Sequence, residues 1–141
     1  YFWYHKTMNK EFIHNVKIYY EDTDSGGVVY YANYLKFLER ARSEIIYSLG
    51  LTNKKLLNNY NTLIIVKSCN IKYKKPAKFE DVLTINSRLK LISKVSFTMI
   101  QIIKRDSEII SDAEVVLVTV NNLGKPVRIP DVLLKLFKKI I

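Results

Sequence analysis

Four strand-like segments follow one another in the second half of the chain with no helical segment between them, and this order most constrains the fold. The segments are LIIVKSCNIKYKK (63–75), KFEDVLTINSRLKLI (78–92), KVSFTMIQIIKR (94–105) and IISDAEVVLVTVN (109–121). Hairpin-like connections such as RDSE join them, and NNLGK ends the run. Such a pattern predicts an antiparallel sheet rather than alternating strands and helices.

One strand and one long helix precede these segments. FIHNVKIYY (12–20) alternates apolar and polar residues and predicts a first strand. Apolar residues then recur at helical spacing from Tyr31 to Leu49, and Gly50 follows, where a helix end favours a left-handed residue. The stripe consists of Tyr31, Leu35, Leu38, Ile45 and Leu49, widened by Phe37, Ala41 and Ile46.

The rest of the chain gives weaker signals. TNKKLLNNYNT (52–62) is predicted to be a polar connection, and IPDVLLKLFKKII (129–141) a short amphipathic helix. At 141 residues we expect one domain, residues 8–141, with residues 1–7 before Met8 as a leader or added segment. A single long helix cannot cover five long apolar strands, so we expect another subunit to bury the edge strand or remaining face.

Charge and cysteine content narrow the function classes. The net charge of +10 favours a polyanionic partner, either nucleic acid, acidic lipid or a nucleotide-bearing cofactor. Nucleic acid is disfavoured because no helix-turn-helix, zinc or RNP motif is present. The densest basic stretch is KSCNIKYKK, whose lone Cys69 forms no internal disulfide and is expected to be a buried structural thiol. No apolar run reaches the roughly 18 residues needed to span a bilayer.

The stretch YYEDTDSGGVVYYANY (19–34) concentrates acids, glycines and tyrosines. A calcium loop counted from Asp22 would need ligands where Gly26 and Asn33 stand, so that interpretation fails. DSGG resembles a serine protease segment, but the chain is short for that fold and its only histidines are His5 and His14. An acid-bearing turn before the helix is the remaining interpretation.

Asp24 lies on this turn, immediately before the strongest helix. The first amides of a helix have no internal partners and carry the positive end of its dipole. A carbonyl oxygen could be polarised there while a carboxylate attacks its carbon or activates water. The structural alternative, in which Asp22 or Asp24 only caps the turn or helix, stays open on spacing alone.

The motif YYEDTDSGGVVYYANYLKFLERARSE resembles the signature of hotdog-fold acyl-CoA thioesterases of the 4-hydroxybenzoyl-CoA thioesterase superfamily. The branch it resembles most is the YbgC type, associated with the Tol–Pal system of bacterial envelopes. KYKKPAKFEDVLTI, with Pro76, Ala77 and Asp81, and GKPVRIP (124–130) resemble later family segments. The resemblance implies an α+β hotdog fold, with one long central helix wrapped by an antiparallel five-stranded sheet.

The resemblance also implies site residues. Asp24 would be the catalytic carboxylate, and the backbone amides of Tyr31 and Tyr30 would bind the oxyanion. Supporting roles fall to Asp22, Gly27 and Glu39. Many YbgC-type members have histidine where this chain has Tyr31, which puts rate and substrate preference, though not the reaction class, in question.

In this family the CoA moiety lies across a subunit interface, with basic side chains against its phosphates. Arg88, Lys90 and Arg128 are candidates for those contacts, and solvated strand-end charges are the alternative. The expected reaction is hydrolysis of an acyl-CoA thioester to free acid and CoA in the bacterial cytoplasm, by a homodimer or homotetramer without metal or cofactor. Acyl carrier protein is an alternative acyl donor, and a non-catalytic or dual-role scaffold for phospholipid-synthesis partners at the inner membrane face is the alternative function.

Overall fold

The structure is a computed structural model and describes residues 10–141. The predicted leader, residues 1–7, lies outside this range. In chain order the elements are β1 (Glu11–Lys17), a 3-10 helix (Tyr20–Asp22), α1 (Tyr31–Ser48), α2 (Asn53–Tyr60), β2 (Leu63–Tyr73), β3 (Val82–Ile92), β4 (Ser96–Arg105), β5 (Glu108–Val120) and α3 (Asp131–Ile140).

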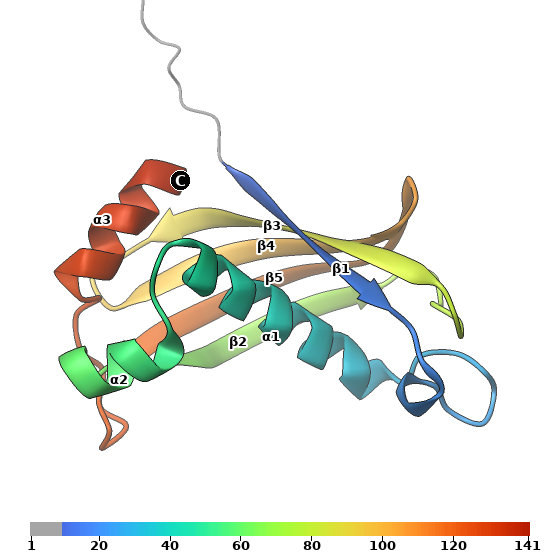
Figure 1. Ribbon diagram of the computed structural model, residues 1–141, viewed down its shortest axis with the longest axis horizontal. Coiled ribbons are helices and arrows are strands. Elements are labelled where there is room, and N and C mark those ends of the chain that lie inside the picture. The colour runs from blue at the N-terminus through green and yellow to red at the C-terminus, as the bar shows by residue number, and fades with distance from the viewer. Residues whose placement is uncertain (1–9) are drawn as a thin grey trace, which may run out of the picture.

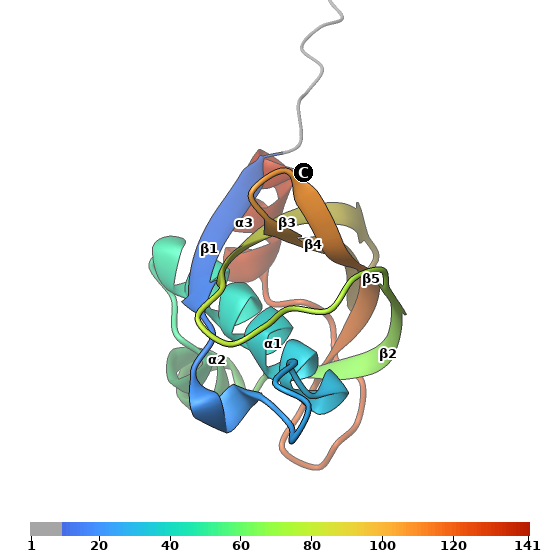
Figure 2. The same cartoon turned by 90° about the vertical axis from the view of Figure 1, so that its right-hand side faces the viewer.

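The strands form one antiparallel sheet in the order β1-β3-β4-β5-β2. The longest helix, α1, runs across one face of this sheet, and α2 and α3 lie toward one end of it (Figure 1). Viewed along the helix, the sheet curves around α1 (Figure 2). The predicted α+β architecture with a five-stranded antiparallel sheet is therefore confirmed.

Helix α1 buries a slightly different face from the one that the apolar stripe suggested. The residues buried as expected are Phe37, Leu38, Ala41, Ile45 and Ile46, and Tyr34 is buried with them. Tyr31 and Leu35, however, are 66% and 46% exposed. Apolar residues occupy more than one side of this helix, so periodicity alone could not decide which side the sheet covers.

A buried polar network fastens α1 to the middle of the sheet. The side chain of Gln101, on β4, is fully buried. Its Nε2 donates hydrogen bonds of 3.0 Å to the Leu38 carbonyl of α1 and to Ser87 Oγ of β3. Its Oε1 accepts a 3.0 Å hydrogen bond from Arg42 Nη1. Because buried polar groups are costly when unpaired, these bonds favour one position of the helix on the sheet.

The segment predicted as a polar connection contains helix α2, so that prediction was wrong. Thr52 caps the helix, because its Oγ1 accepts a 3.0 Å hydrogen bond from the Lys55 amide. Asn61 ends it in the left-handed conformation, with φ of 48°. Leu56 is the buried residue of α2. Because a single apolar side chain packs this helix against the core, the sequence shows only a weak helical periodicity.

The boundaries of the first strand and long helix also reflect local chemistry. Strand β1 ends at Lys17, earlier than predicted, because Tyr20–Asp22 turn into a 3-10 helix. The predicted left-handed end of α1 is confirmed, since Gly50 has φ of 86°. The amide of Leu51 then donates to the Ile46 carbonyl at 3.2 Å, as in a glycine-terminated helix.

Strand β2 is an edge strand, and this position corrects the expectation for Cys69. Its partner in the sheet is β5 on one side. Cys69 is exposed rather than buried, and Ile65 and Val66 are 45% and 47% exposed. Within residues 10–141, no helix is long and apolar enough to cross a membrane.

Candidate active site

Asp24 occupies the tip of a tight hairpin between β1 and α1. Thr23 and Val29 form an isolated antiparallel bridge that closes the hairpin. The Asp24 amide donates to the Val28 carbonyl at 2.9 Å, and the Gly27 amide donates to the Asp24 carbonyl at 3.1 Å. Gly27 has φ of 79°, so the turn uses a conformation that other residues rarely adopt.

The two carboxylates of the motif have different surroundings. Asp22 Oδ2 accepts a 2.9 Å hydrogen bond from the Tyr19 amide, as a local cap. Asp24 Oδ1 accepts a 2.8 Å hydrogen bond from the Gly26 amide. Asp24 Oδ2 has no hydrogen-bond partner among the described residues. The turn thus holds one oxygen of Asp24 and leaves the other available.

The start of α1 lies beside this carboxylate. The Tyr30 amide donates to the Asp22 carbonyl at 3.1 Å, which counts against Tyr30 as an oxyanion donor. The next amide, of Tyr31, begins the helix and finds no acceptor elsewhere in residues 10–141. A free first-turn amide with the helix dipole behind it is a suitable donor to a developing oxyanion.

A second loop fastens the hairpin. The Val29 amide donates to the Ala77 carbonyl at 2.9 Å. The Ala77 amide in turn donates to the hydroxyl of Tyr34, on the first turns of α1, at 3.1 Å. The rings of Tyr20 and Phe79 stack with centroids 3.8 Å apart. The Asp24 hairpin is therefore held against the β2–β3 loop and α1 together.

An ion-pair network also anchors the β2–β3 loop. Arg105 Nη1 donates to Asp81 Oδ2 at 2.7 Å, and Arg105 Nη2 donates to Glu108 Oε1 at 2.6 Å. Lys75 donates to the second oxygen of Glu108. Hydrogen bonds from Lys75 and then Arg105 lower the pKa of Glu108 to about 2.

Asp24 opens into a pocket of about 390 Å³, which also contains residues that sequence reasoning did not assign to the site. Its lining includes Tyr30, Tyr31, Tyr34, Tyr73, Lys74 and Pro76. The rings of Tyr31 and Tyr73 lie 4.8 Å apart. Burial raises the pKa of Tyr34 and of Tyr73, so both phenols stay protonated near neutral pH. The sequence signal that could have identified Tyr73 and Lys74 as site residues is the KYKKPA segment, since it contains both and resembles a segment of the family.

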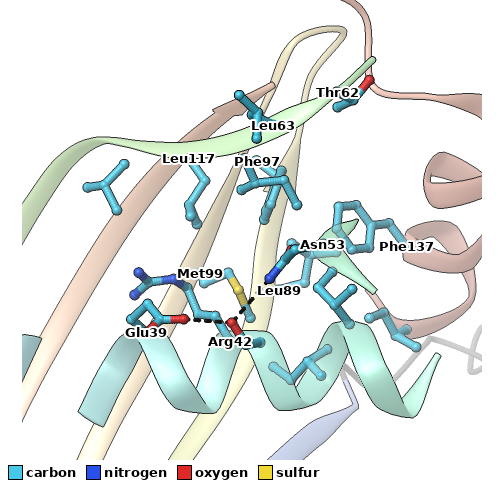
Figure 3. Close-up of a pocket in the computed structure, with 16 residues that line it drawn as sticks. Glu39, Arg42, Asn53, Thr62, Leu63, Leu89, Phe97, Met99, Leu117 and Phe137 are labelled. Atoms are coloured by element: carbon cyan, nitrogen blue, oxygen red, sulfur yellow. Dashed lines mark hydrogen bonds between the residues drawn. The ribbon is translucent and has the colours of Figure 1, made fainter. Parts of the chain in front are cut away.

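A separate, more apolar pocket of about 310 Å³ lies toward the other end of α1 (Figure 3). Glu39 belongs to this pocket, not to that of Asp24. Its Oε2 accepts a 2.7 Å hydrogen bond from Ser43 Oγ. Burial lowers the pKa of the neighbouring Arg42, although the guanidinium stays charged. The structure thus separates Glu39 from the candidate carboxylate.

The three basic candidates for CoA binding do not meet at the Asp24 pocket within one chain. Arg88 lines a shallow hollow on the outer sheet face with Lys72 and Asp112. Lys90 pairs with Glu114 at 2.9 Å. Arg128 lines a third hollow, before α3.

Comparison with known proteins identifies the family. The family model of the thioesterase-like superfamily matches residues 19–137, which include the hairpin, α1 and strands β2 to β5. The chain belongs to this superfamily. The acyl-CoA thioesterase YbgC of Haemophilus influenzae is 37% identical over 125 residues, covering 87% of this chain and 91% of the relative. The acyl-CoA thioester hydrolase YbgC of Escherichia coli is 33% identical over 126 residues, covering 88% and 93%.

Solved structures confirm the hotdog fold. A probable thioesterase from Bartonella henselae superposes with a TM-score of 0.83 at 32% identity, covering 86% of this chain and 100% of that one. The 4-hydroxybenzoyl-CoA thioesterase of a Pseudomonas strain has a TM-score of 0.84 at 23% identity, covering 89% and 98%, and this likeness concerns the fold alone. The predictions of a hotdog fold and of a thioesterase are thus confirmed.

Proposed function

We propose that this chain hydrolyses acyl-CoA thioesters to carboxylic acid and CoA, with Asp24 as the reacting carboxylate. The observation that carries the proposal is the free Oδ2 of Asp24 beside the open amide of Tyr31 in one pocket. The two YbgC relatives, an acyl-CoA thioesterase and an acyl-CoA thioester hydrolase, support the substrate class. A CoA-linked substrate is consistent with an enzyme that acts in the cytoplasm.

This arrangement allows two routes for hydrolysis of the thioester. In the general-base route, Asp24 takes a proton from water, and the resulting hydroxide attacks the thioester carbon. The Tyr31 amide stabilises the oxyanion, the C–S bond breaks, and the proton returns to the departing thiolate. In the nucleophilic route, Asp24 attacks the thioester carbon, the C–S bond breaks, and CoA leaves as a thiolate that takes a proton from water. Water then hydrolyses the mixed anhydride, which releases the carboxylic acid and restores the Asp24 carboxylate.

The test is release of free thiol from a panel of acyl-CoAs by the wild type and by Asp24→Asn. This substitution keeps size but removes charge and basicity, so we expect kcat to fall at least about a hundredfold. Asp106→Asn, in the exposed turn between β4 and β5, is the matched control and should keep full activity. Equal rates for wild type and Asp24→Asn would refute the role of Asp24. A wild type inactive on every acyl-CoA would instead favour acyl carrier protein as donor, or the scaffold function.

We further propose a homodimer in which β2 pairs with its own copy. The outer edge of β2 carries no strand among the described residues, and an unpaired edge with exposed Ile65 and Val66 favours strand addition. An antiparallel pair about the middle of β2 is symmetric, as closed dimers require. Ser68→Pro should remove a strand hydrogen bond and yield monomers in light scattering. An unchanged dimer with that substitution would contradict β2 pairing.

Arg88, Lys90 and Arg128 remain proposals for the CoA phosphates, to be contributed across subunits. Phosphate contacts are charge-assisted and salt-sensitive. Alanine in place of a residue that does bind the phosphates should raise KM for acyl-CoA, and KM should then depend less on salt concentration. Unchanged KM for all three variants would exclude them.

A further inference from the structure

The apolar pocket at the far end of α1 has no role in the chemistry described above. It is bounded by α1, by the first half of β2, by the inner sheet face and by α3. Leu117 and Met99 of the sheet and Phe137 of α3 surround the hollow (Figure 3). Protein interiors rarely contain voids much larger than a water molecule, so a pocket of about 310 Å³ in this position points to a ligand.

Its chemistry is that of a site for an alkyl chain. The walls are formed by aliphatic, aromatic and thioether side chains such as Leu89, Phe97 and Met99. Polar groups gather on the α1 and α2 side, where Asn53 Nδ2 donates to Ser43 Oγ at 3.4 Å and Ser43 donates to Glu39. No hydrogen-bonding group on the sheet wall could recognise a hydroxylated aromatic ring, since that wall is wholly apolar among the described lining residues.

Volume indicates how long a chain the pocket accepts. An engineered apolar cavity of about 150 Å³ takes up benzene, which has six carbons. The pocket here, of about 310 Å³, is twice that size. It therefore has room for about ten to twelve carbons of an aliphatic chain.

The location relates this pocket to the catalytic hairpin. Leu63 and Val66, in the first half of β2, line the apolar pocket, whereas Tyr73, at the other end of β2, lines the Asp24 pocket. In the proposed dimer, antiparallel β2 pairing brings the first half of one strand beside the second half of its copy. The apolar pocket of one protomer then lies next to the Asp24 pocket of its partner.

We propose that this pocket binds the aliphatic tail of the substrate, so that the enzyme prefers medium- to long-chain acyl groups, and that α3 sets the length limit. This inference rests on the proposed function and on the β2 dimer. Phe137 and Ile140 of α3 close the pocket at its end. The ring of Phe137 is held by Phe97, with centroids 4.7 Å apart, and forms a fixed floor.

The experiment compares kcat/KM for butanoyl-, octanoyl- and dodecanoyl-CoA. The wild type should favour dodecanoyl-CoA over butanoyl-CoA. Leu117→Trp puts an indole into the pocket, and because each buried methylene contributes about a factor of four in affinity, displacing three should lower that preference at least about thirtyfold. Phe137→Leu enlarges the floor and should move the preferred chain length upward.

A control and a binding measurement separate this inference from the proposed function. Val116→Trp adds the same ring to the adjacent residue on the opposite sheet face, outside the pocket, and should leave the chain-length preference unchanged. Asp24→Asn should still bind dodecanoate in calorimetry, and adding Leu117→Trp to it should weaken that binding.

The outcomes are distinguishable. An unchanged preference in both pocket variants, with no dodecanoate binding, would overturn the tail site even if Asp24→Asn is inactive. A preference for aromatic acyl-CoA that Leu117→Trp leaves intact would overturn it too. Shifted preference with a fully active Asp24→Asn would support the tail site and refute the catalytic assignment.

Discussion

Tyr34→Phe tests how strongly α1 holds the Asp24 hairpin. The substitution removes only the hydroxyl that accepts the 3.1 Å hydrogen bond from the Ala77 amide. Ala77 is fully buried, so its amide would lose its partner without gaining water. An unsatisfied buried amide costs about 1–3 kcal/mol of unfolding free energy. At a urea m-value of about 2 kcal/mol/M, the unfolding midpoint should fall by about 0.5–1.5 M.

We expect loss of the same bond to lower catalysis as well. Ala77 accepts from Val29 in the Asp24 hairpin, so loosening the β2–β3 loop should displace Asp24. Because misplacement by about 1 Å can cost a hundredfold, we expect kcat to fall at least about tenfold while KM changes less.

The assay is urea unfolding at one fixed protein concentration, since dissociation of the proposed dimer would make the midpoint concentration-dependent. Thiol-release kinetics are measured on the same samples. Tyr47→Phe is the control, because Tyr47 is 47% exposed on the same helix and should change stability by less than about 0.5 kcal/mol. A Tyr34→Phe midpoint and kcat both equal to those of Tyr47→Phe would refute the reasoning.

Two further predictions follow from the polar networks. Gln101→Leu removes the hydrogen bonds to Arg42, Leu38 and Ser87. This should lower the free energy of unfolding by about 2–3 kcal/mol, which corresponds to a fall of roughly 6–12 °C in Tm. An unchanged Tm would mean that the network adds no stability. Glu108, whose pKa is lowered to about 2, should stabilise the fold fully above its unfolded pKa near 4.5 and lose that contribution as pH falls toward 2. The Tm advantage of wild type over Glu108→Gln should therefore shrink between pH 6 and pH 2.5, and a constant difference would contradict this.

The strand segments along the chain and the long helix could be predicted because their signals are local. The order of the strands in the sheet was not predicted, since β2 pairs with the distant β5 rather than with β3. Alternation, turn residues and Gly50 fix where these elements run, and all reappear in the structure. Helix α2 was missed because its single buried anchor, Leu56, gives no repeating pattern. Cys69 was expected to be buried because an apolar strand in sequence does not reveal whether it lies at the centre or edge of a sheet.

Within the site, the turn and helix start could be read from Asp24, Gly27 and Tyr31, because they are close in sequence. The support from Tyr34 and Ala77 could not, since 43 positions separate them. Glu39 appeared near Asp24 in sequence, yet the rise of α1, about 1.5 Å per residue, carries it to another pocket.

The two hollows along α1 also bear on how this enzyme can diversify. Asp24 and Tyr31 lie at one end of the helix, and the apolar lining residues lie toward the other. Substitutions in α3 or at the start of β2 can remodel one hollow without touching the hairpin that carries the carboxylate. Descendants of this chain could therefore acquire new acyl preferences by single substitutions while their hydrolytic chemistry is inherited unchanged.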